Sequence, residues 1–466
     1  MGTQVAETGE LRRNVLPLSR LAIQGLAVIG PSITVAVLLT GVAGVALSAT
    51  PLVFVIATIA VLINANTAIQ YSKKISSAGG FYTYVSNGLG PKIGILSGLY
   101  QLFYQVTNIA FLALWNGYFI GAVYGFFTGV QVSNTSMLLI ALVTVVFYFA
   151  IQYLGVKVAV EFNFITGLIE SAFLVLISFV IIAVSYSANT AAVFTPGLAG
   201  FSGVGLGMIF ALLSFGGYTT IVSLSEEAKN PKETIGRAII FTVLLAGGVF
   251  IITTYAMTIG WGYTNMAAFA ALPLPGFTVV KMKVGIVAAF ILALIVLSSN
   301  LNAVNGQMIN ISRVVFRMAR DRVFPEKLGS VHPKFRSPYM SLIALTIVST
   351  VVMLLTYAVI SPLIDAVFLL ATFATVGTIM VHTLSNISLI RFSIKIKEFK
   401  VLLHGILPVA GTLLILYALY ASVWPAVFPF YLAPIALIIW TVLSILYVQW
   451  ISHRKLKLED VGKFTL

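Results

Sequence analysis

Two short segments, Gly30-Pro31-Ser32 and Ser214-Phe215-Gly216-Gly217-Tyr218, interrupt two long apolar runs of this 466-residue chain. Proline cannot donate to a helical hydrogen-bond ladder, and glycine tolerates backbone conformations that end a helix. We therefore expect each run to form a broken helix, in which backbone N–H and C=O groups are freed near the middle.

The chain around these segments is strongly apolar. Hydrophobic residues make up 59% of it and charged residues only 9%, and the mean hydropathy is +1.05. A soluble protein of this composition would lack a polar surface, so lipid is the expected solvent. At about 20 residues per span, the apolar runs predict an all-α integral membrane protein with about twelve transmembrane helices, near 18–47, 51–72, 92–123, 135–154, 160–187, 203–225, 236–262, 283–316, 339–360, 363–391, 401–423 and 426–450.

The positive charges follow the connections between these spans. Of the 27 Lys and Arg residues, all but Lys281 and Lys283 lie on or beside alternate connections. The positive-inside rule then predicts a multi-pass protein of the plasma membrane with both termini in the cytoplasm. Topology and the anionic inner leaflet account for the net charge of +14, so we expect the lipid bilayer and no nucleic acid as a partner.

Reactive side chains are scarce. The chain has no cysteine, and its four histidines show no metal-binding spacing, so we expect no cofactor. Only His382 and His404 fall within predicted spans, where a structural role is expected. Of the thirteen acids only Glu170 is clearly mid-span, so no convergent catalytic set exists and a membrane enzyme is excluded.

The positions of the two interruptions predict the organisation of the chain. Five spans separate them, which predicts a 5+5 inverted repeat, and broken helices at matching points of two halves indicate a midplane site for a small molecule. We expect a cytoplasmic N-terminal segment, a ten-helix transport core made of two repeats, two additional transmembrane helices and a cytoplasmic tail, with no obligate protein partner. These parts are 1–17, 18–391 (repeats about 18–187 and 203–391), 401–450 and 451–466.

Three motifs resemble those of the amino acid/polyamine/organocation (APC) transporters with the LeuT-like fold, and the resemblance covers roughly residues 20–395. The motifs are Phe215-Gly216-Gly217-Tyr218 through Glu226-Glu227-Ala228-Lys229-Asn230-Pro231 to Arg237-Ala238-Ile239; Ala78-Gly79-Gly80-Phe81-Tyr82-Thr83-Tyr84-Val85 with Leu89-Gly90-Pro91; and Ser312-Arg313 with Met318-Ala319-Arg320-Asp321, Pro325 and His332-Pro333-Lys334.

The resemblance implies a secondary transporter that binds an amino acid between its two broken helices. Backbone N–H groups beside Gly30 would hold the carboxylate, carbonyls of both breaks would hold the ammonium, and Gly217 would leave room for the side chain, beside wall or gate residues Phe215 and Tyr218. The implied N–H donors are Ser32, Ile33 and Thr34, and the implied carbonyls lie near Val28, Ile29, Leu213, Ser214 and Phe215.

The chain departs from the family pattern at three points. Pro31 removes one N–H donor from the first break, and Thr219 stands where many relatives carry a glutamate. Glu170, in the fifth span, stands where proton-coupled or sodium-independent relatives carry a lysine. Glu170 is either protonated in one state, because burial disfavours its charged form, or helps to hold Na⁺ with Ser298 and Ser299, or a substrate ammonium, or is a structural hydrogen-bonding group.

Further polar residues lie at the cytoplasmic edge and along two spans. We interpret Glu226, Glu227, Lys229, Arg320 and Asp321 as an ion-pair network of an inner gate, with solvated helix caps as the alternative. Two polar stripes support a lined cavity, although such residues also join helices and packing is the favoured interpretation. They are Gln101, Gln105, Asn108 and Trp115 on the third span, and Ser298, Asn302, Asn305 and Ser312 on the eighth.

These features predict a proton-coupled symporter of a neutral or aromatic amino acid that works by alternating access. An amino acid exchanger and a Na⁺-coupled symporter are the nearest alternatives. A membrane sensor that binds an amino acid without moving it would share the same sequence features.

Overall fold

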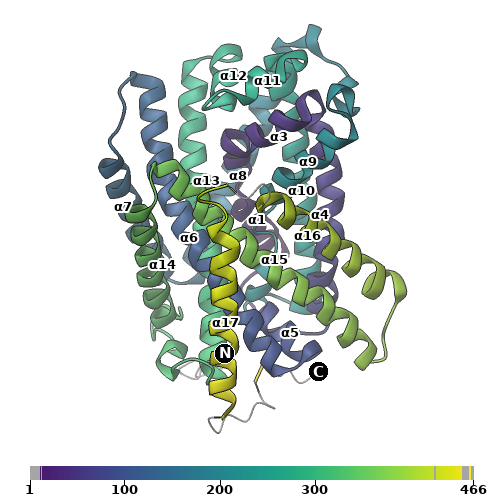
Figure 1. Ribbon diagram of the computed structural model, residues 1–466, viewed down its shortest axis with the longest axis vertical. Helices are drawn as coiled ribbons and strands as arrows, with labels where there is room; N and C mark the ends of the chain where they lie inside the picture. The colour runs from purple at the N-terminus through teal and green to yellow at the C-terminus, as the bar shows by residue number, and fades with distance from the viewer. Residues whose placement is uncertain (1–10, 12, 424–426, 454–460, 463–466) are drawn as a thin grey trace, which may run out of the picture.

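The predicted apolar runs are helices in the computed structural model, which describes residues 11, 13–423, 427–453 and 461–462 (Figure 1). The described residues contain no strand. Their α-helices are α1 (Leu18–Ile29), α2 (Pro31–Ile33), α3 (Leu39–Ala46), α4 (Thr50–Ser72), α5 (Phe81–Leu89), α6 (Pro91–Thr128), α7 (Asn134–Tyr153), α8 (Val156–Val184), α9 (Gly200–Ser214), α10 (Pro231–Trp261), α11 (Met266–Ala270), α12 (Pro275–Lys283), α13 (Ile286–Arg320), α14 (Tyr339–Val359), α15 (Leu363–Lys395), α16 (Leu407–Val423) and α17 (Leu432–His453).

The hydropathy of these helices confirms an all-α membrane protein of about twelve spans. Eleven described stretches are long and apolar enough to cross a bilayer, and Val401–Tyr417 is a shorter apolar helix. Large apolar side chains on the outer faces are exposed, among them Val143, Leu176 and Val287, each at least 65% exposed. A surface of this kind is stable in lipid rather than in water.

Most predicted boundaries differ from the observed ones by a few residues. A larger difference is at the sixth span, predicted as 203–225, where the apolar helical stretch is Ala192–Ser214. The last span also differs. That span was predicted from residue 426, but α17 begins at Leu432. The reason is Pro429, which disfavours helix at the preceding residue and cannot donate to a helical ladder. Large parts of the predicted segments 1–17 and 451–466 lie outside the described residues, as does residue 426.

Short helices that were not predicted fill two of the connections. α5 lies between the second and third spans, and α11 and α12 lie between the seventh and eighth. α6 follows α5 directly, because Gly90 adopts a φ of 98° and Pro91 takes the first helical position, where a missing N–H costs nothing. α5 lies at one end of the bundle, and α11 and α12 lie at the opposite end (Figure 1).

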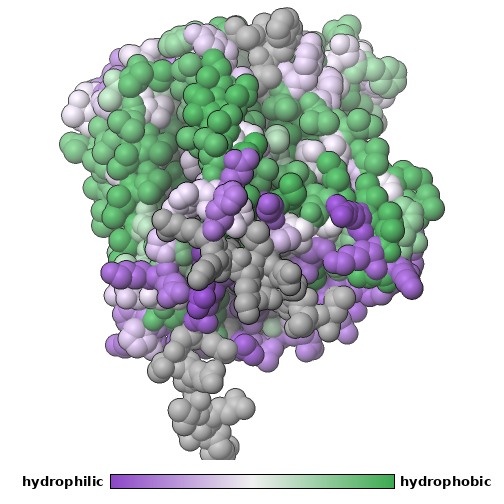
Figure 2. Space-filling view, turned by 60° about the horizontal axis from the view of Figure 1, so that its bottom comes forward, coloured by the Kyte–Doolittle hydropathy of each residue, from purple (hydrophilic) through white to green (hydrophobic). Residues whose placement is uncertain are grey.

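The long helices pack in pairs from the two predicted halves. α4 contacts α10, α6 contacts α13, and α7 contacts α14, and these are the second and seventh, third and eighth, and fourth and ninth spans. The domain boundaries and the repeat stay predictions. We call the end of the bundle that holds α5, the start of α6 and the end of α13 the basic end. Figure 2 shows hydrophilic residues gathered there, next to the hydrophobic flanks.

A glycine sets the close approach of α5 to α15 at the basic end. A Cβ on Gly88 would lie 2.5 Å from the Ser388 carbonyl oxygen and 2.7 Å from the Tyr71 hydroxyl. These two partners are themselves joined, because the Tyr71 and Ser388 hydroxyls are hydrogen-bonded at 2.6 Å. The contact therefore leaves no room for a side chain.

We expect Gly88→Ala to destabilise the protein by about 1–3 kcal/mol, because overpacking forces backbone or side-chain shifts. The measurement is the apparent Tm of purified protein in detergent. Gly248→Ala on α10 is the matched control, since a Cβ there meets nothing within 4 Å. Equal Tm values for the two variants would contradict the packing described here.

Candidate functional site

The first break lies between α1 and α2. Gly30 has a positive φ of 65°, and Pro31 begins the new turn without an N–H to donate. The Ser32 N–H donates to Oε1 of Glu170 at 2.9 Å, and the Ile33 N–H donates to the Gly30 carbonyl at 3.0 Å. The break is therefore a tight, internally bonded turn that is tied to α8 through Glu170.

These bonds free two carbonyl groups. In a continuous helix the Val28 and Ile29 carbonyls would accept from the N–H groups four residues later, those of Ser32 and Ile33. Both N–H groups are used elsewhere. The Val28 and Ile29 oxygens therefore lack their helical donors, and acceptors of this kind suit an ammonium.

In this structure the N–H groups of the predicted carboxylate cradle at the first break are already hydrogen-bonded. The Ser32 N–H is bonded to Glu170, the Ile33 N–H to Gly30, and the Thr34 N–H donates to the Pro31 carbonyl. The sequence could not show this, because Glu170 lies 138 residues from Ser32 along the chain. None of the three N–H groups is available to a ligand without breaking an existing bond.

The second break offers donors instead. The chain leaves α9 and turns through residues 215–219, with a φ of 117° at Gly217, before the 3₁₀ turn Thr220–Leu224. Among the described residues, the N–H groups of Gly217, Tyr218 and Thr219 have no hydrogen-bond partner. Successive backbone N–H groups that lack acceptors are groups that can bind an anion.

Both breaks border one cavity of about 290 Å³, whose described lining contains no acid, lysine or arginine. It lies among α1, α4, α6, α9, α13, α15 and α16. Eight of the predicted binding residues line it: Val28, Ile29, Ile33, Thr34, Leu213, Ser214, Gly217 and Tyr218.

Three other predicted binding residues do not line this cavity, for a local reason in each case. The Ser32 N–H and hydroxyl both point to Glu170. Gly30 lies against Ser299, whose hydroxyl would be 2.9 Å from an added Cβ. Phe215 is fully buried and its ring packs on another aromatic ring 5.0 Å away, so it is a core residue rather than a wall of the cavity.

The polar stripes identified only part of the lining. Asn108 and Trp115 of the third-span stripe line the cavity, but Gln101 and Gln105 do not. On the eighth span none of the four stripe residues lines it. Sequence reasoning also missed the lining residues Asn64, Tyr104, Ala303, Gln307 and His382; the only signal for most of them was a polar side chain inside an apolar helix.

Glu170 lies behind the first break. It is fully buried, and its Oε1 accepts from the Ser32 N–H (2.9 Å), the Ser32 hydroxyl (2.9 Å) and the Ser299 hydroxyl (2.6 Å). Its Oε2 has no partner among the described residues, and no described salt bridge involves Glu170. The carboxyl group therefore joins α2, α8 and α13 through one oxygen and leaves the other unused.

Of the residues predicted to share a Na⁺ site with Glu170, the structure places only Ser299 in contact with it. The neighbouring Ser298 lies on the same helix but is absent from the hydrogen bonds described around Glu170. Instead, Asn302 lies one turn further along α13, and its Oδ1 accepts from the Thr166 hydroxyl at 2.6 Å.

The predicted gate acids make contacts between spans, but with partners other than those predicted. Glu227 forms a buried bidentate pair with Arg313 (2.6 and 3.1 Å), and the Arg313 guanidinium also donates to a carbonyl of its own helix. Glu226 accepts from the Ala78 N–H at 2.8 Å. These contacts tie the segment after the second break to α13 and to the loop before α5.

Asp321 ties the end of α13 to α5, since it accepts from the Tyr82 hydroxyl at 2.7 Å. It also pairs with Arg317 on its own helix. The Lys229 N–H donates to the Leu16 carbonyl, and the Arg320 guanidinium lies over the Phe316 ring of α13. The part of these two side chains in an ion-pair network stays a prediction. The chain ahead of α1 thus also bonds to the segment after the second break.

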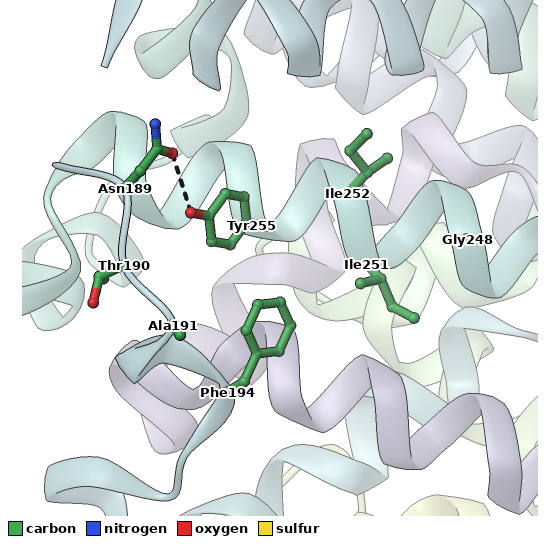
Figure 3. A pocket seen from close by; sticks show the side chains of 8 residues that line it. All are labelled: Asn189, Thr190, Ala191, Phe194, Gly248, Ile251, Ile252 and Tyr255. Carbon is green, nitrogen blue, oxygen red and sulfur yellow. Dashed lines mark hydrogen bonds between the residues drawn. The ribbon is translucent and has the colours of Figure 1, made fainter. Parts of the chain in front are cut away.

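A second hollow, of about 550 Å³, lies away from the breaks on the outer face of α10 (Figure 3). The Tyr255 hydroxyl donates to Asn189 Oδ1 at 3.1 Å, and the Tyr255 ring stacks on Phe194. Its lining is mainly apolar and includes the exposed Gly248. This hollow contains none of the backbone groups freed by the breaks, so the internal cavity is the candidate site.

In comparisons with known proteins, the chain is similar to several transporters. The chain is similar to the low-affinity putrescine importer PlaP of Escherichia coli (strain K12), with 29% identity over 353 residues, 71% of this chain and 72% of the relative. It is also similar to the branched-chain amino acid permease BcaP of Bacillus subtilis (strain 168), with 25% identity over 62% of this chain and 63% of the relative.

A third relative is the serine/threonine exchanger SteT of Bacillus subtilis (strain 168), with 24% identity over 59% of this chain and 61% of the relative. The model of the family described as amino acid permease matches residues 21–456, which include both broken helices and the cavity between them. The chain therefore belongs to the amino acid permease family of the APC superfamily, whose members are transporters rather than enzymes.

Proposed function

We propose that this permease carries a neutral amino acid across the plasma membrane by alternating access, in symport with a proton. The observation that carries the proposal is the pairing of free carbonyls at the first break with free N–H groups at the second break, around one cavity. A zwitterion is the ligand that needs both an acceptor group and a donor group at close range.

The two breaks would orient the substrate. The Val28 and Ile29 carbonyls receive the ammonium, and the N–H groups of Gly217, Tyr218 and Thr219 receive the carboxylate. The breaks are in contact, because a Cβ on Gly217 would lie 3.2 Å from the Val28 carbonyl oxygen. A dication such as a diamine is disfavoured, since no acid lies in the described lining to pair with its second charge.

The positive-inside rule makes the basic end cytoplasmic. In this conformation the contacts of Glu226, Glu227 and Asp321 hold that end together. Release of substrate to the cytoplasm requires these contacts to break, and we assign them to an inner gate. The Glu227–Arg313 pair is the strongest of them, because both partners are at most 2% exposed and the geometry is bidentate.

The coupling site is Glu170. Because its Oε1 already accepts three hydrogen bonds, a proton on this carboxyl group would sit on Oε2, which has no described partner. Loss of that proton would place a charge beside the first break and change the bonding of Ser32, which links the coupling site to the Val28 and Ile29 carbonyls.

Removing one partner of the gate pair should destabilise this closed conformation. We expect Arg313→Leu to cost about 3–5 kcal/mol, because it removes the bidentate partner of the buried Glu227 carboxylate. The double variant Glu227→Leu/Arg313→Leu should lose less than Arg313→Leu alone. The measurement is the apparent Tm in detergent, and a double variant that is less stable than both single variants would contradict a gate held by this pair.

Proton coupling is tested by uptake of labelled amino acids into proteoliposomes. We compare an inward proton gradient, an inward Na⁺ gradient and preloading with unlabelled substrate. We expect the proton gradient to drive accumulation and Glu170→Gln to reduce that accumulation at least about fivefold, because glutamine keeps a hydrogen-bond acceptor but cannot release a proton. Substrate binding, measured by a shift in Tm, should persist in the variant.

Glu161→Gln is the matched control, because Glu161 lies on the same helix but is exposed and paired with Arg20 at 3.1 Å. It should accumulate substrate as the wild type does. Uptake that needs Na⁺ would identify a sodium symporter, and uptake that needs internal substrate would identify an exchanger. Binding without flux under all three conditions would identify a sensor. Any of these results would overturn proton symport.

A further inference from the structure

The half of the cavity nearer the basic end is polar. Three of its polar lining residues lie at the same depth: Tyr104 of α6, Gln307 of α13 and His382 of α15. Their helices reach the basic end at Pro91, Arg320 and Lys395, respectively, and each residue lies thirteen positions from that point. At 1.5 Å per residue this places all three about 20 Å from that end. They line the cavity together with Asn64 of α4 and Tyr218 beside the second break.

Two amide oxygens in this group lack hydrogen-bond donors. Gln307 is only 5% exposed, and its Oε1 has no partner among the described residues. Asn64 donates from Nδ2 to the Tyr218 hydroxyl at 2.9 Å, but its Oδ1 is buried without a described partner. A buried acceptor left unpaired costs about 1–3 kcal/mol. The Asn64 oxygen lies against Gly411 of α16, where an added Cβ would be 3.1 Å from it, so Gln307 is the acceptor of this group that would gain most from a ligand that donates.

The same group offers a donor. The Tyr218 hydroxyl accepts from Asn64, and no described acceptor takes its own hydrogen. His382 stacks on the Tyr218 ring at 6.3 Å and meets the edge of Phe81 at 5.3 Å. No described hydrogen bond or ion pair involves its ring nitrogens, so in either neutral tautomer it adds one donor and one acceptor.

We propose that Asn64, Tyr218, Gln307 and His382 form a subsite for the side chain of the substrate, and that this side chain ends in a hydroxyl or a carboxamide. The proposal rests on the proposed function, because the ammonium and carboxylate of the amino acid occupy the two breaks. Side chains such as those of serine, threonine, asparagine and glutamine carry both a donor and an acceptor and no charge.

The alternatives fit the subsite less well. An ammonium or carboxylate side chain would be buried without a countercharge, because the described lining holds no acid, lysine or arginine. An aliphatic side chain would leave the Gln307 oxygen unpaired. A site built from hydrogen-bonding groups rejects a ligand that lacks the matching group more strongly than an apolar pocket rejects an extra methylene.

The test is competition for uptake in proteoliposomes. Labelled L-glutamine and L-serine are the probes, and L-leucine, L-lysine, L-glutamate and putrescine are the competitors, together with unlabelled L-asparagine and L-threonine. We expect asparagine and threonine to compete at concentrations at least about tenfold lower than any of the other four. Stronger competition by leucine than by threonine would overturn the subsite while leaving the transport function intact. No uptake of any labelled amino acid would overturn the proposed function itself.

The variant Gln307→Leu tests whether Gln307 binds the side chain of the substrate. It should raise the KM for L-glutamine by about five- to tenfold and leave the KM for L-leucine within about twofold, because only the polar side chain loses its partner. Gln101→Leu is the matched control: Gln101 is equally buried and its Oε1 is also unpartnered, but it does not line the cavity. Equal KM changes for both substrates in Gln307→Leu would contradict the subsite. If Gln307→Leu fails to fold, Gln307→Asn is measured instead and is judged by the same split between the two KM values.

Discussion

The carboxyl group of Glu170 is the interaction on which the site depends. Proline at position 31 removes one N–H from the first break, and the next N–H, that of Ser32, leaves the helical ladder to bond Glu170. Ser299 bonds the same oxygen from α13. The buried Oε1 atom of Glu170 therefore holds the junction of α1 and α2 in position against α8 and α13. Without this acceptor the Ser32 N–H would be unpaired or would return to the Val28 carbonyl, and the break would lose a freed acceptor.

This arrangement separates the roles of the two breaks. The first break uses its N–H groups internally and presents carbonyls, whereas the second presents successive N–H groups at Gly217, Tyr218 and Thr219. Gly217 permits a φ of 117°, which turns the chain so that these groups are not consumed by a helix. In the proposed binding mode, charge in the ligand is met by backbone dipoles, since the described lining contains no acid, lysine or arginine.

The spans and both interruptions could be predicted from the sequence, because hydropathy, proline and glycine act locally. The first break lies at Gly30-Pro31 as expected. The bonding at that break could not be predicted, since whether Ser32 faces a ligand or Glu170 depends on the rotation of α8 against α1. The same limit applies to Arg313, whose pairing with Glu227 joins two helices that are distant in the chain, and to Gln307, which lies off the polar stripe of its helix. Contacts between spans decide which polar side chains face the cavity, and a single sequence contains no record of them.

The neutrality of the cavity constrains how coupling can work. Glu170 lies outside the described lining, so a proton on it would not touch the substrate directly. In the proposed coupling, its influence passes through the residues that bond to it, which are Ser32, by two hydrogen bonds, and Ser299, by one. Ser32 is the residue whose N–H would otherwise cap the Val28 carbonyl, and that carbonyl faces the proposed ammonium position. A change in the charge of Glu170 that alters its hold on Ser32 therefore changes the acceptor strength at the substrate site. Coupling by this route needs no charged residue in the cavity, which leaves the polar half of the cavity free to select the side chain.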